Sequence, residues 1–196
     1  MKDLVYLDEY NLMGINYYWN RRNLFGLSEE KLIEAGVDSD RVQVHRDIID
    51  KLISVNKIFQ EKGYILFDKE GYRPKKLYEY MYQERVKKFG KKETDRLVNM
   101  EIMPHASGKS VDVTLWDKKE DKEIFLRNKN DGTDALFVDF YKDKEDSKSK
   151  WYQEMQEYVI NTMQDHGFRL GKRREYFHFD YKSDIPKNYE NGFRQN

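Results

Sequence analysis

The sequence predicts an α+β protein in which helices pack on a central antiparallel sheet. Segments with helical periodicity cluster early and late in the chain, and strand-like apolar runs lie between them without regular alternation. Regular alternation would be typical of a doubly wound parallel sheet, so its absence favours the α+β class. The length of 196 residues suits one domain, and we expect a single domain over residues 1–196.

The first predicted helix runs from Arg41 to Lys62. Its apolar residues recur at steps of three and four, namely Ile48, Leu52, Val55 and Phe59. Capping side chains precede it at Asp38, Ser39 and Asp40, and Gly63 is expected to end it. The apolar run 64–68 then predicts a strand, and the Gly and Pro of segment 70–74 indicate a turn.

The second predicted helix spans about Lys75 to Phe89 and ends at Gly90. A strand is predicted after Gly108, because Val111, Val113 and Leu115 alternate with more polar residues. In this alternation Asp112 points away from the apolar face. The charged stretches near 117–123 and 142–150 are predicted to be solvated loops or the start of a helix.

The third predicted helix ends at Gly167. Its apolar stripe consists of Trp151, Met155, Tyr158, Val159, Thr162 and Met163. The aromatic-rich segment 174–181 follows and is predicted to be a strand.

Composition excludes several classes of function. Lys plus Arg and Asp plus Glu both total 36, so the net charge is zero and no basic surface for nucleic acid or membrane is expected. The absence of cysteine excludes disulfides, thiolate zinc sites and cysteine nucleophiles. No apolar run approaches the ~18 residues of a membrane span. The start of the chain lacks an apolar signal core, so a cytoplasmic location is expected, whereas the oligomeric state is not indicated.

Two distant segments, 105–112 and 175–178, carry the residues of a candidate metal site. His105, Asp112 and His178 supply two imidazoles and one carboxylate, which can hold zinc and leave one position for water. Zinc would lower the pKa of that water towards ~7. Glu175 is the natural general base. In an ideal strand residues 175 and 178 point to opposite faces, so we expect a bend or bulge between them.

Other residues have ordinary explanations. Single histidines are usually structural, and we interpret His45 and His166 in this way. His166 precedes Gly167 at a helix C-terminus, where a cation is favoured by the helix dipole. Arg73 is either a surface arginine or a fixed cation that stabilises the oxyanion of a tetrahedral intermediate.

These motifs resemble the signature of the zinc D,D-peptidases, most closely the D-alanyl-D-alanine dipeptidases associated with vancomycin resistance. The family pattern Ser-x-His-x-x-Gly-x-Ala-x-Asp is matched at His105, Gly108 and Asp112, and its Glu-x-x-His at Glu175 and His178. The family's Asp-Gly-Tyr-Arg-Pro is matched by segment 70–74, which reads Glu-Gly-Tyr-Arg-Pro. Near the N-terminus, Tyr6 and segment 11–14 are also similar, as is segment 163–181. The resemblance therefore covers nearly the whole chain in the expected order.

The resemblance implies a zinc D,D-peptidase (hedgehog-like) fold and a Zn2+ cofactor. It implies that His105, Asp112 and His178 bind zinc, that Glu175 is the general base and that Arg73 stabilises the transition state. The implied reaction is hydrolysis of D-alanyl-D-alanine to two D-alanines, which removes this cell-wall precursor dipeptide from the cytoplasm.

The sequence departs from the family at positions that bind substrate. Met103 replaces the family serine, and Ser110 replaces the family alanine. The aspartate that recognises the substrate amino group falls on Leu136, with Asp134 and Asp139 close by. Without a carboxylate there, the substrate ammonium would be left unpaired, which is costly in a closed pocket.

These departures leave two alternatives open. One is a zinc D,D-carboxypeptidase or peptidoglycan endopeptidase that acts on longer stem peptides of the cell wall. The other is a non-catalytic module that binds peptidoglycan fragments, although binding alone would require neither Glu175 nor Arg73.

Overall fold

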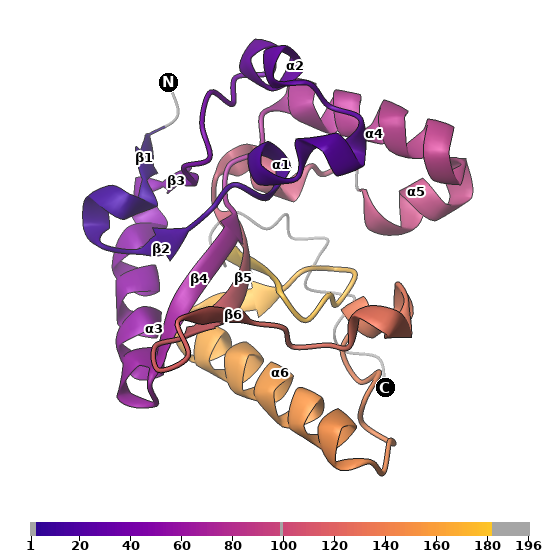
Figure 1. The fold of residues 1–196 in the computed structure, drawn as a ribbon. Coiled ribbons are helices and arrows are strands. Elements are labelled where there is room, and N and C mark those ends of the chain that lie inside the picture. Colours follow the sequence, from indigo (N-terminus) through magenta and orange to yellow (C-terminus); the bar gives the residue numbers. More distant parts are fainter. Residues whose placement is uncertain (1–2, 99, 182–196) are drawn as a thin grey trace. The chain divides into compact units, whose positions relative to one another are not determined.

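The computed structural model describes residues 3–98 and 100–181 and has a mixed α+β fold (Figure 1). This confirms the predicted class. The helices are α1 Tyr17–Asn20, α2 Glu29–Glu34, α3 Ile49–Glu61, α4 Lys75–Phe89, α5 Lys91–Leu97 and α6 Ser147–Asp165. The strands are β1 Leu4–Tyr6, β2 Met13–Gly14, β3 Gln43–His45, β4 Tyr64–Glu70, β5 Ser110–Asp117, β6 Lys122–Ile124, β7 Phe168–Leu170 and β8 His178–Tyr181.

The strands form two sheets. A two-stranded sheet pairs β1 with β3, and a six-stranded sheet has the order β2-β4-β5-β8-β7, with β6 paired to β5. The pairs β1–β3, β5–β6 and β7–β8 are antiparallel. The chain also divides into two compact units, residues 1–49 with 68–111 and residues 50–67 with 112–196. The expectation of a single domain stays a prediction.

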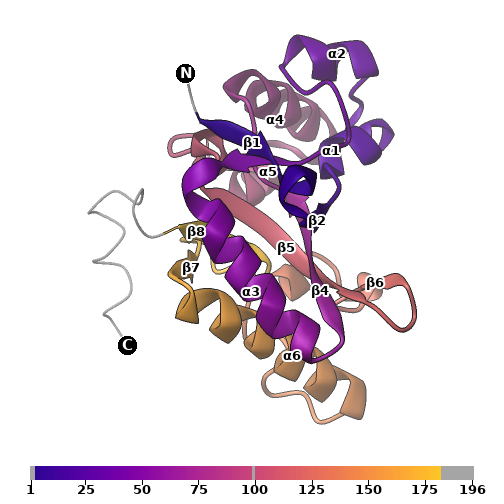
Figure 2. The same cartoon turned by 90° about the vertical axis from the view of Figure 1, so that its left-hand side faces the viewer.

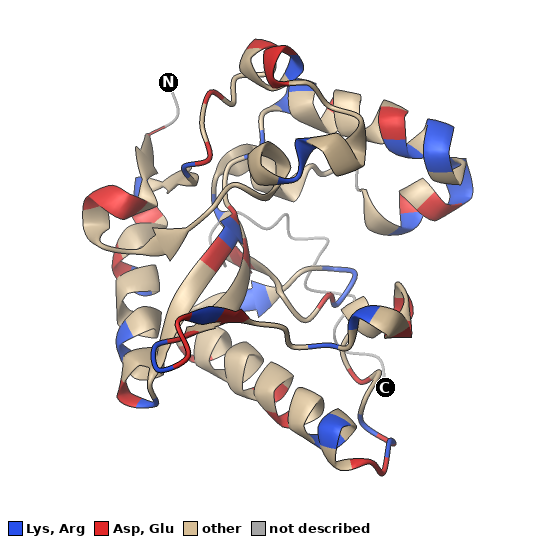
Figure 3. Cartoon of the chain, in the orientation of Figure 1, with Lys and Arg blue, Asp and Glu red and all other residues tan. Residues whose placement is uncertain are grey.

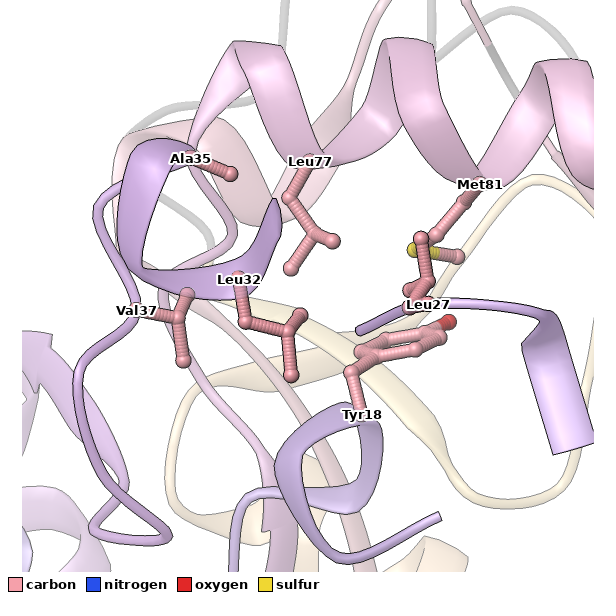
Figure 4. Close-up of a cluster of buried hydrophobic side chains, with 7 residues drawn as sticks. All are labelled: Tyr18, Leu27, Leu32, Ala35, Val37, Leu77 and Met81. Atoms are coloured by element: carbon pink, nitrogen blue, oxygen red, sulfur yellow. The ribbon is translucent and has the colours of Figure 1, made fainter. Parts of the chain in front are cut away.

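The first unit has an apolar core between its helices. Ser28 caps α2 by accepting a hydrogen bond from the backbone N–H of Lys31 (3.3 Å), and this helix then presents Leu32 to α4. Figure 4 shows the resulting cluster of Tyr18, Leu27, Leu32, Ala35, Val37, Leu77 and Met81. These side chains are buried, so the apolar faces of α2 and α4 stabilise one another.

The second unit packs α3 and α6 together, and Figure 2 shows the two helices side by side. The rings of Phe59 and Tyr158 lie 5.3 Å apart in an edge-to-face arrangement. Gly63 ends α3 with a φ of +83°, a backbone conformation that glycine adopts without strain. In the part of β5 that belongs to this unit, Val113 and Leu115 are fully buried, whereas Asp112 is half-buried, as their alternation predicts.

Most predicted elements are confirmed, but three details are wrong. The helix expected from Arg41 begins at Ile49, because Gln43–His45 pair with β1 instead. His45 ends this strand and accepts a hydrogen bond from the backbone N–H of Asp47 (3.2 Å), a structural role. The strand expected over 174–181 begins only at His178. Trp151 does not belong to the buried stripe of α6, since 39% of its surface is exposed.

Charged residues of both signs are interspersed along the helices and loops (Figure 3). This agrees with the equal totals of acidic and basic residues in the sequence. Among the residues that the structure describes, none of the helices is both long enough and apolar enough to cross a bilayer.

Candidate metal centre

His105 is held in a defined orientation within the first unit. It lies in the 3₁₀ helix Pro104–Ser107 and is buried. Its Nδ1 lies 2.8 Å from the carbonyl oxygen of Gly71. A carbonyl oxygen can only accept a hydrogen bond, so Nδ1 carries the proton and Nε2 of the neutral ring carries the lone pair. The backbone of His105 is also anchored, because its N–H donates to the Tyr78 hydroxyl (3.0 Å).

Arg73 lies beside His105, whose carbonyl oxygen accepts the Arg73 backbone N–H at 3.1 Å. Only 7% of Arg73 is exposed, so the interpretation as a surface arginine is wrong. Its Nε and Nη2 donate to the two carboxylate oxygens of Glu70, the first at 2.6 Å. The guanidinium carbon lies 4.9 Å from the centre of the Tyr18 ring and 4.3 Å from that of Tyr78.

The surroundings of Arg73 keep it charged. Burial by itself would lower the pKa of the guanidinium, but the negative charge of Glu70 outweighs this effect and holds the pKa well above its ordinary value. The two tyrosine rings add favourable cation–π contacts. Arg73 is therefore a buried, fixed cation.

Asp112 and His178 meet in the second unit. Asp112 Oδ1 lies 2.7 Å from His178 Nδ1, and Asp180 Oδ1 lies 3.2 Å from His178 Nε2. His178 and Asp180 are both buried. Burial alone would lower the pKa of His178, but hydrogen bonds to the two carboxylates raise it well above its ordinary value.

Glu175 precedes His178 across a tight turn. The backbone N–H of His178 donates to the carbonyl oxygen of Glu175 at 3.2 Å, which closes a four-residue turn through Tyr176 and Phe177. Glu175 itself forms an isolated antiparallel bridge with Phe137. The bend expected between residues 175 and 178 is therefore present. The role of the Glu175 side chain as general base stays a prediction.

The described part of the chain contains a group suited to a metal ion, formed by His105, Asp112 and His178. The first histidine belongs to the first unit, and the aspartate and the second histidine belong to the second. Two imidazole nitrogens and one carboxylate oxygen form a donor set that suits zinc with an open position. Each imidazole also has its second nitrogen next to an acceptor, the Gly71 carbonyl or the Asp180 carboxylate, as is typical of metal-bound histidines. The residues present thus fit the metal.

The segment expected to recognise substrate lies against the backbone of residues 174–176. Tyr176 N–H donates to the Leu136 carbonyl (3.1 Å), and Val138 N–H donates to the Arg174 carbonyl (3.0 Å). Asp139 forms an exposed ion pair with Arg174 at 3.1 Å. In the other unit, Met103 has a φ of +46°, in the left-handed region, and directly precedes the 3₁₀ helix of His105.

Sequence reasoning missed several residues of the centre. The sequence motifs give no role to Asp180, Tyr18 or Tyr78, and Glu70 enters only as the first residue of the motif at 70–74. Asp180 could have been found from strand periodicity, because residues 178 and 180 of one strand project to the same face. No local pattern connects Tyr18 with Arg73, since 55 positions separate them and only tertiary packing brings them together.

Comparisons with known proteins give matches among solved structures only. No family model matches the chain, and no curated protein matches it either. One match is the LdcB LD-carboxypeptidase, whose structure shows how that enzyme recognises peptidoglycan. It is 16% identical to this chain, with a TM-score of 0.48. That match covers 76% of this chain and 64% of LdcB, so this chain spans less than two thirds of LdcB.

Two vancomycin-resistance enzymes are also similar. The D,D-pentapeptidase VanY from a VanB-type cassette, in complex with Zn(II), is 12% identical, with a TM-score of 0.47 and coverage of 72% of this chain and 74% of VanY. The D,D-dipeptidase VanXYg, in complex with a D-Ala-D-Ala phosphinate analog, is 20% identical, with a TM-score of 0.46. The match covers 98% of this chain and 72% of VanXYg. At TM-scores below 0.5, these similarities assign no role to any residue of this chain.

Proposed function

We propose that this protein is a zinc-dependent peptidase that hydrolyses D-alanyl-D-alanine to two D-alanines. The grouping of His105, Asp112 and His178, with Glu175 one turn before the last of them, is the observation that carries the proposal. The motif resemblance supports it, because the same residues stand in the order that the zinc D,D-peptidase signature requires. Since this dipeptide is a cell-wall precursor, the proposal includes a cytoplasmic location.

Each residue has a chemical role in this proposal. His105, Asp112 and His178 would hold zinc, which when bound lowers the pKa of water and polarises a carbonyl group. The Glu175 carboxylate would accept a proton from the attacking water and return it to the departing amine. Arg73, kept charged by Glu70, would stabilise the negative charge that develops on the substrate carbonyl oxygen.

A second candidate keeps this chemistry but changes the substrate to a longer stem peptide. It is supported by Met103 and Leu136, which occupy positions where the family carries polar substrate-binding groups. Asp139, three residues from Leu136, forms an ion pair with Arg174 at 3.1 Å, so its carboxylate already has a cationic partner. A non-catalytic peptidoglycan-binding module is a weaker candidate, because such a module needs no buried arginine beside the metal ligand.

The test is D-alanine release from D-alanyl-D-alanine by the zinc-loaded protein, with Glu175→Gln as the matched variant. We expect release by the wild type and a loss of about 10²–10⁴-fold in kcat for the variant, the range that a general base contributes. Zinc content should stay at one equivalent in both proteins, because Glu175 is not a proposed ligand.

Three other outcomes would change the conclusion. Turnover of a stem pentapeptide but not of the dipeptide would select the second candidate. Dipeptide binding without hydrolysis would select the binding module. Full activity of Glu175→Gln would overturn the assignment of the base.

A further inference from the structure

The antiparallel pair β7–β8 carries His178 together with residues that the motifs do not include. In its register Leu170 lies opposite Phe179, and Arg169 lies opposite Asp180. The pairing continues to Gly171, whose N–H donates to the His178 carbonyl at 3.2 Å. Residues 178 and 180 project to one face of β8, and the residues opposite them on β7 share that face.

Gly171 leaves the space that the His178 ring occupies. A Cβ atom added to Gly171 would lie 2.3 Å from Cδ2 and 2.9 Å from Nε2 of His178. Both distances are shorter than any normal contact, so a side chain here would displace the ring. The histidine therefore lies directly over the backbone of the neighbouring strand.

Asp180 meets the ring on its Nε2 side. Its Oδ1 lies 3.2 Å from Nε2, and only 5% of Asp180 is exposed. A buried carboxylate requires hydrogen-bond donors, and the imidazole N–H supplies one of them. Because Nε2 is directed to Asp180, Nδ1 is directed to Asp112, 2.7 Å away.

We propose that Asp180 and Gly171 are positioning residues for the metal centre. Asp180 holds the proton of His178 on Nε2, so that Nδ1 is the nitrogen offered to the metal, and Gly171 allows the ring to lie in this orientation. A carboxylate that accepts from a metal-bound histidine also makes the ligand nitrogen more basic, which strengthens metal binding. The inference rests on the proposed metal site and adds how its third ligand is oriented.

The first measurement is zinc affinity by competition with a chromophoric chelator. For Asp180→Ala we expect a Kd at least 10-fold and up to about 100-fold weaker than that of the wild type, the usual effect of removing such a partner. Asp180→Asn keeps an oxygen that can accept the Nε2 proton, so it should recover part of this loss. Asp165→Asn, at the exposed end of α6, is the control and should bind zinc as the wild type does.

The second measurement is a spectroscopic signature that general destabilisation would not produce. In zinc-loaded wild type, ¹⁵N NMR of the histidine side chains should show His178 with metal-bound Nδ1 and protonated Nε2. In Asp180→Ala the Nε2 proton should exchange faster with solvent. Gly171→Ala should weaken zinc binding although Asp180 is retained, because the added methyl group displaces the ring.

The outcomes separate this proposal from the proposed function. If the wild type bound no zinc, the metal site itself would be wrong. If the wild type bound zinc but Asp180→Ala and Gly171→Ala bound it equally well, the positioning roles would be overturned. Circular dichroism identifies a variant that fails to fold, and Asp180→Asn then decides: an unchanged Kd together with an unchanged Nε2 proton would contradict the role of Asp180.

Discussion

At the scale of single residues, the best-defined feature is the buried pair of Glu70 and Arg73. The side chains of the pair are 3% and 8% exposed, and two donors of the guanidinium meet both carboxylate oxygens. Removing both charges from such a pair often costs little, whereas removing one leaves the other buried without compensation. We therefore expect a substitution that removes the charge of Glu70 or of Arg73 alone to destabilise the first unit.

We predict that Glu70→Gln lowers the free energy of unfolding by about 3–5 kcal/mol, because the Arg73 charge stays buried without its counter-ion. Urea unfolding followed by circular dichroism measures this loss. Glu34→Gln is the control, since Glu34 pairs with Lys76 on the surface and its loss should change stability little. Equal losses in the two variants would contradict the argument.

Histidine roles also become distinct at this scale. His45 and His166, which the sequence predicts to be structural, each make a local hydrogen bond, and His166 Nδ1 lies 2.8 Å from the Thr162 carbonyl at the end of α6. His105 and His178 differ from them because both are buried and both belong to the group suited to a metal. Burial and membership of the metal group together therefore separate these two histidines from the other two.

At the scale of elements, α6 is the longest helix of the described residues, with 19 residues. Asp146 caps it by accepting a hydrogen bond from the backbone N–H of Ser149 at 2.9 Å. Hydrogen bonds from Ser149, first from its side chain and then from its backbone, lower the pKa of Asp146 below its ordinary value of 3.8. The ionised form of this carboxylate is therefore favoured by folding.

We predict that this cap stabilises the protein in a pH-dependent way. The pKa of the Asp146 carboxyl is lower in the folded protein than in the unfolded chain. The stabilisation by this carboxylate is therefore fully present above the unfolded pKa and is lost as the pH falls through the folded pKa. Asp146→Ala should lower the thermal midpoint at pH 7, and the difference from the wild type should shrink towards pH 3.

The matched control for this prediction is Asp146→Asn, because asparagine caps helices about as well but does not titrate in this range. Its difference from Asp146→Ala should stay constant with pH. If the thermal midpoints of the wild type and Asp146→Ala differed by the same amount at pH 7 and at pH 3, the titration argument would fail.

At the scale of the whole molecule, metal binding and folding are expected to be coupled. His105, Asp112 and His178 are separated by up to 73 positions, and an unfolded chain does not hold them together. A ligand that binds only the folded state stabilises it by mass action. Zinc at about 100 times its Kd should therefore raise the free energy of unfolding by about 2.7 kcal/mol.

Differential scanning calorimetry with and without zinc tests this coupling. The thermal midpoint of the wild type should rise with zinc and fall back when a chelator is added. His105→Ala should lose both the stoichiometric zinc and the shift. A variant that kept full zinc binding would refute the assignment of His105 as a ligand.

Much of the architecture follows from the sequence because it depends on local periodicity. The second predicted helix, Lys75 to Phe89, agrees with α4 at both ends, and the apolar alternation around Asp112 agrees with β5. The donors of the metal group were also predicted, from the spacing of the two motif segments and from the family resemblance. Such features need only residue types and their spacing.

Other features depended on partners that are distant in sequence. The strand at 43–45 replaced the predicted start of a helix because β1 supplied its hydrogen bonds, and the strand predicted from 174 was shortened by the turn after Glu175. The sequence by itself determined the α+β class, the three longest helices of the described residues and the candidate ligands. Only the tertiary structure decided that Arg73 is buried against Glu70 and that Asp180 holds His178, because hydrogen-bond partners, burial and ring orientation arise only when the strands and helices pack.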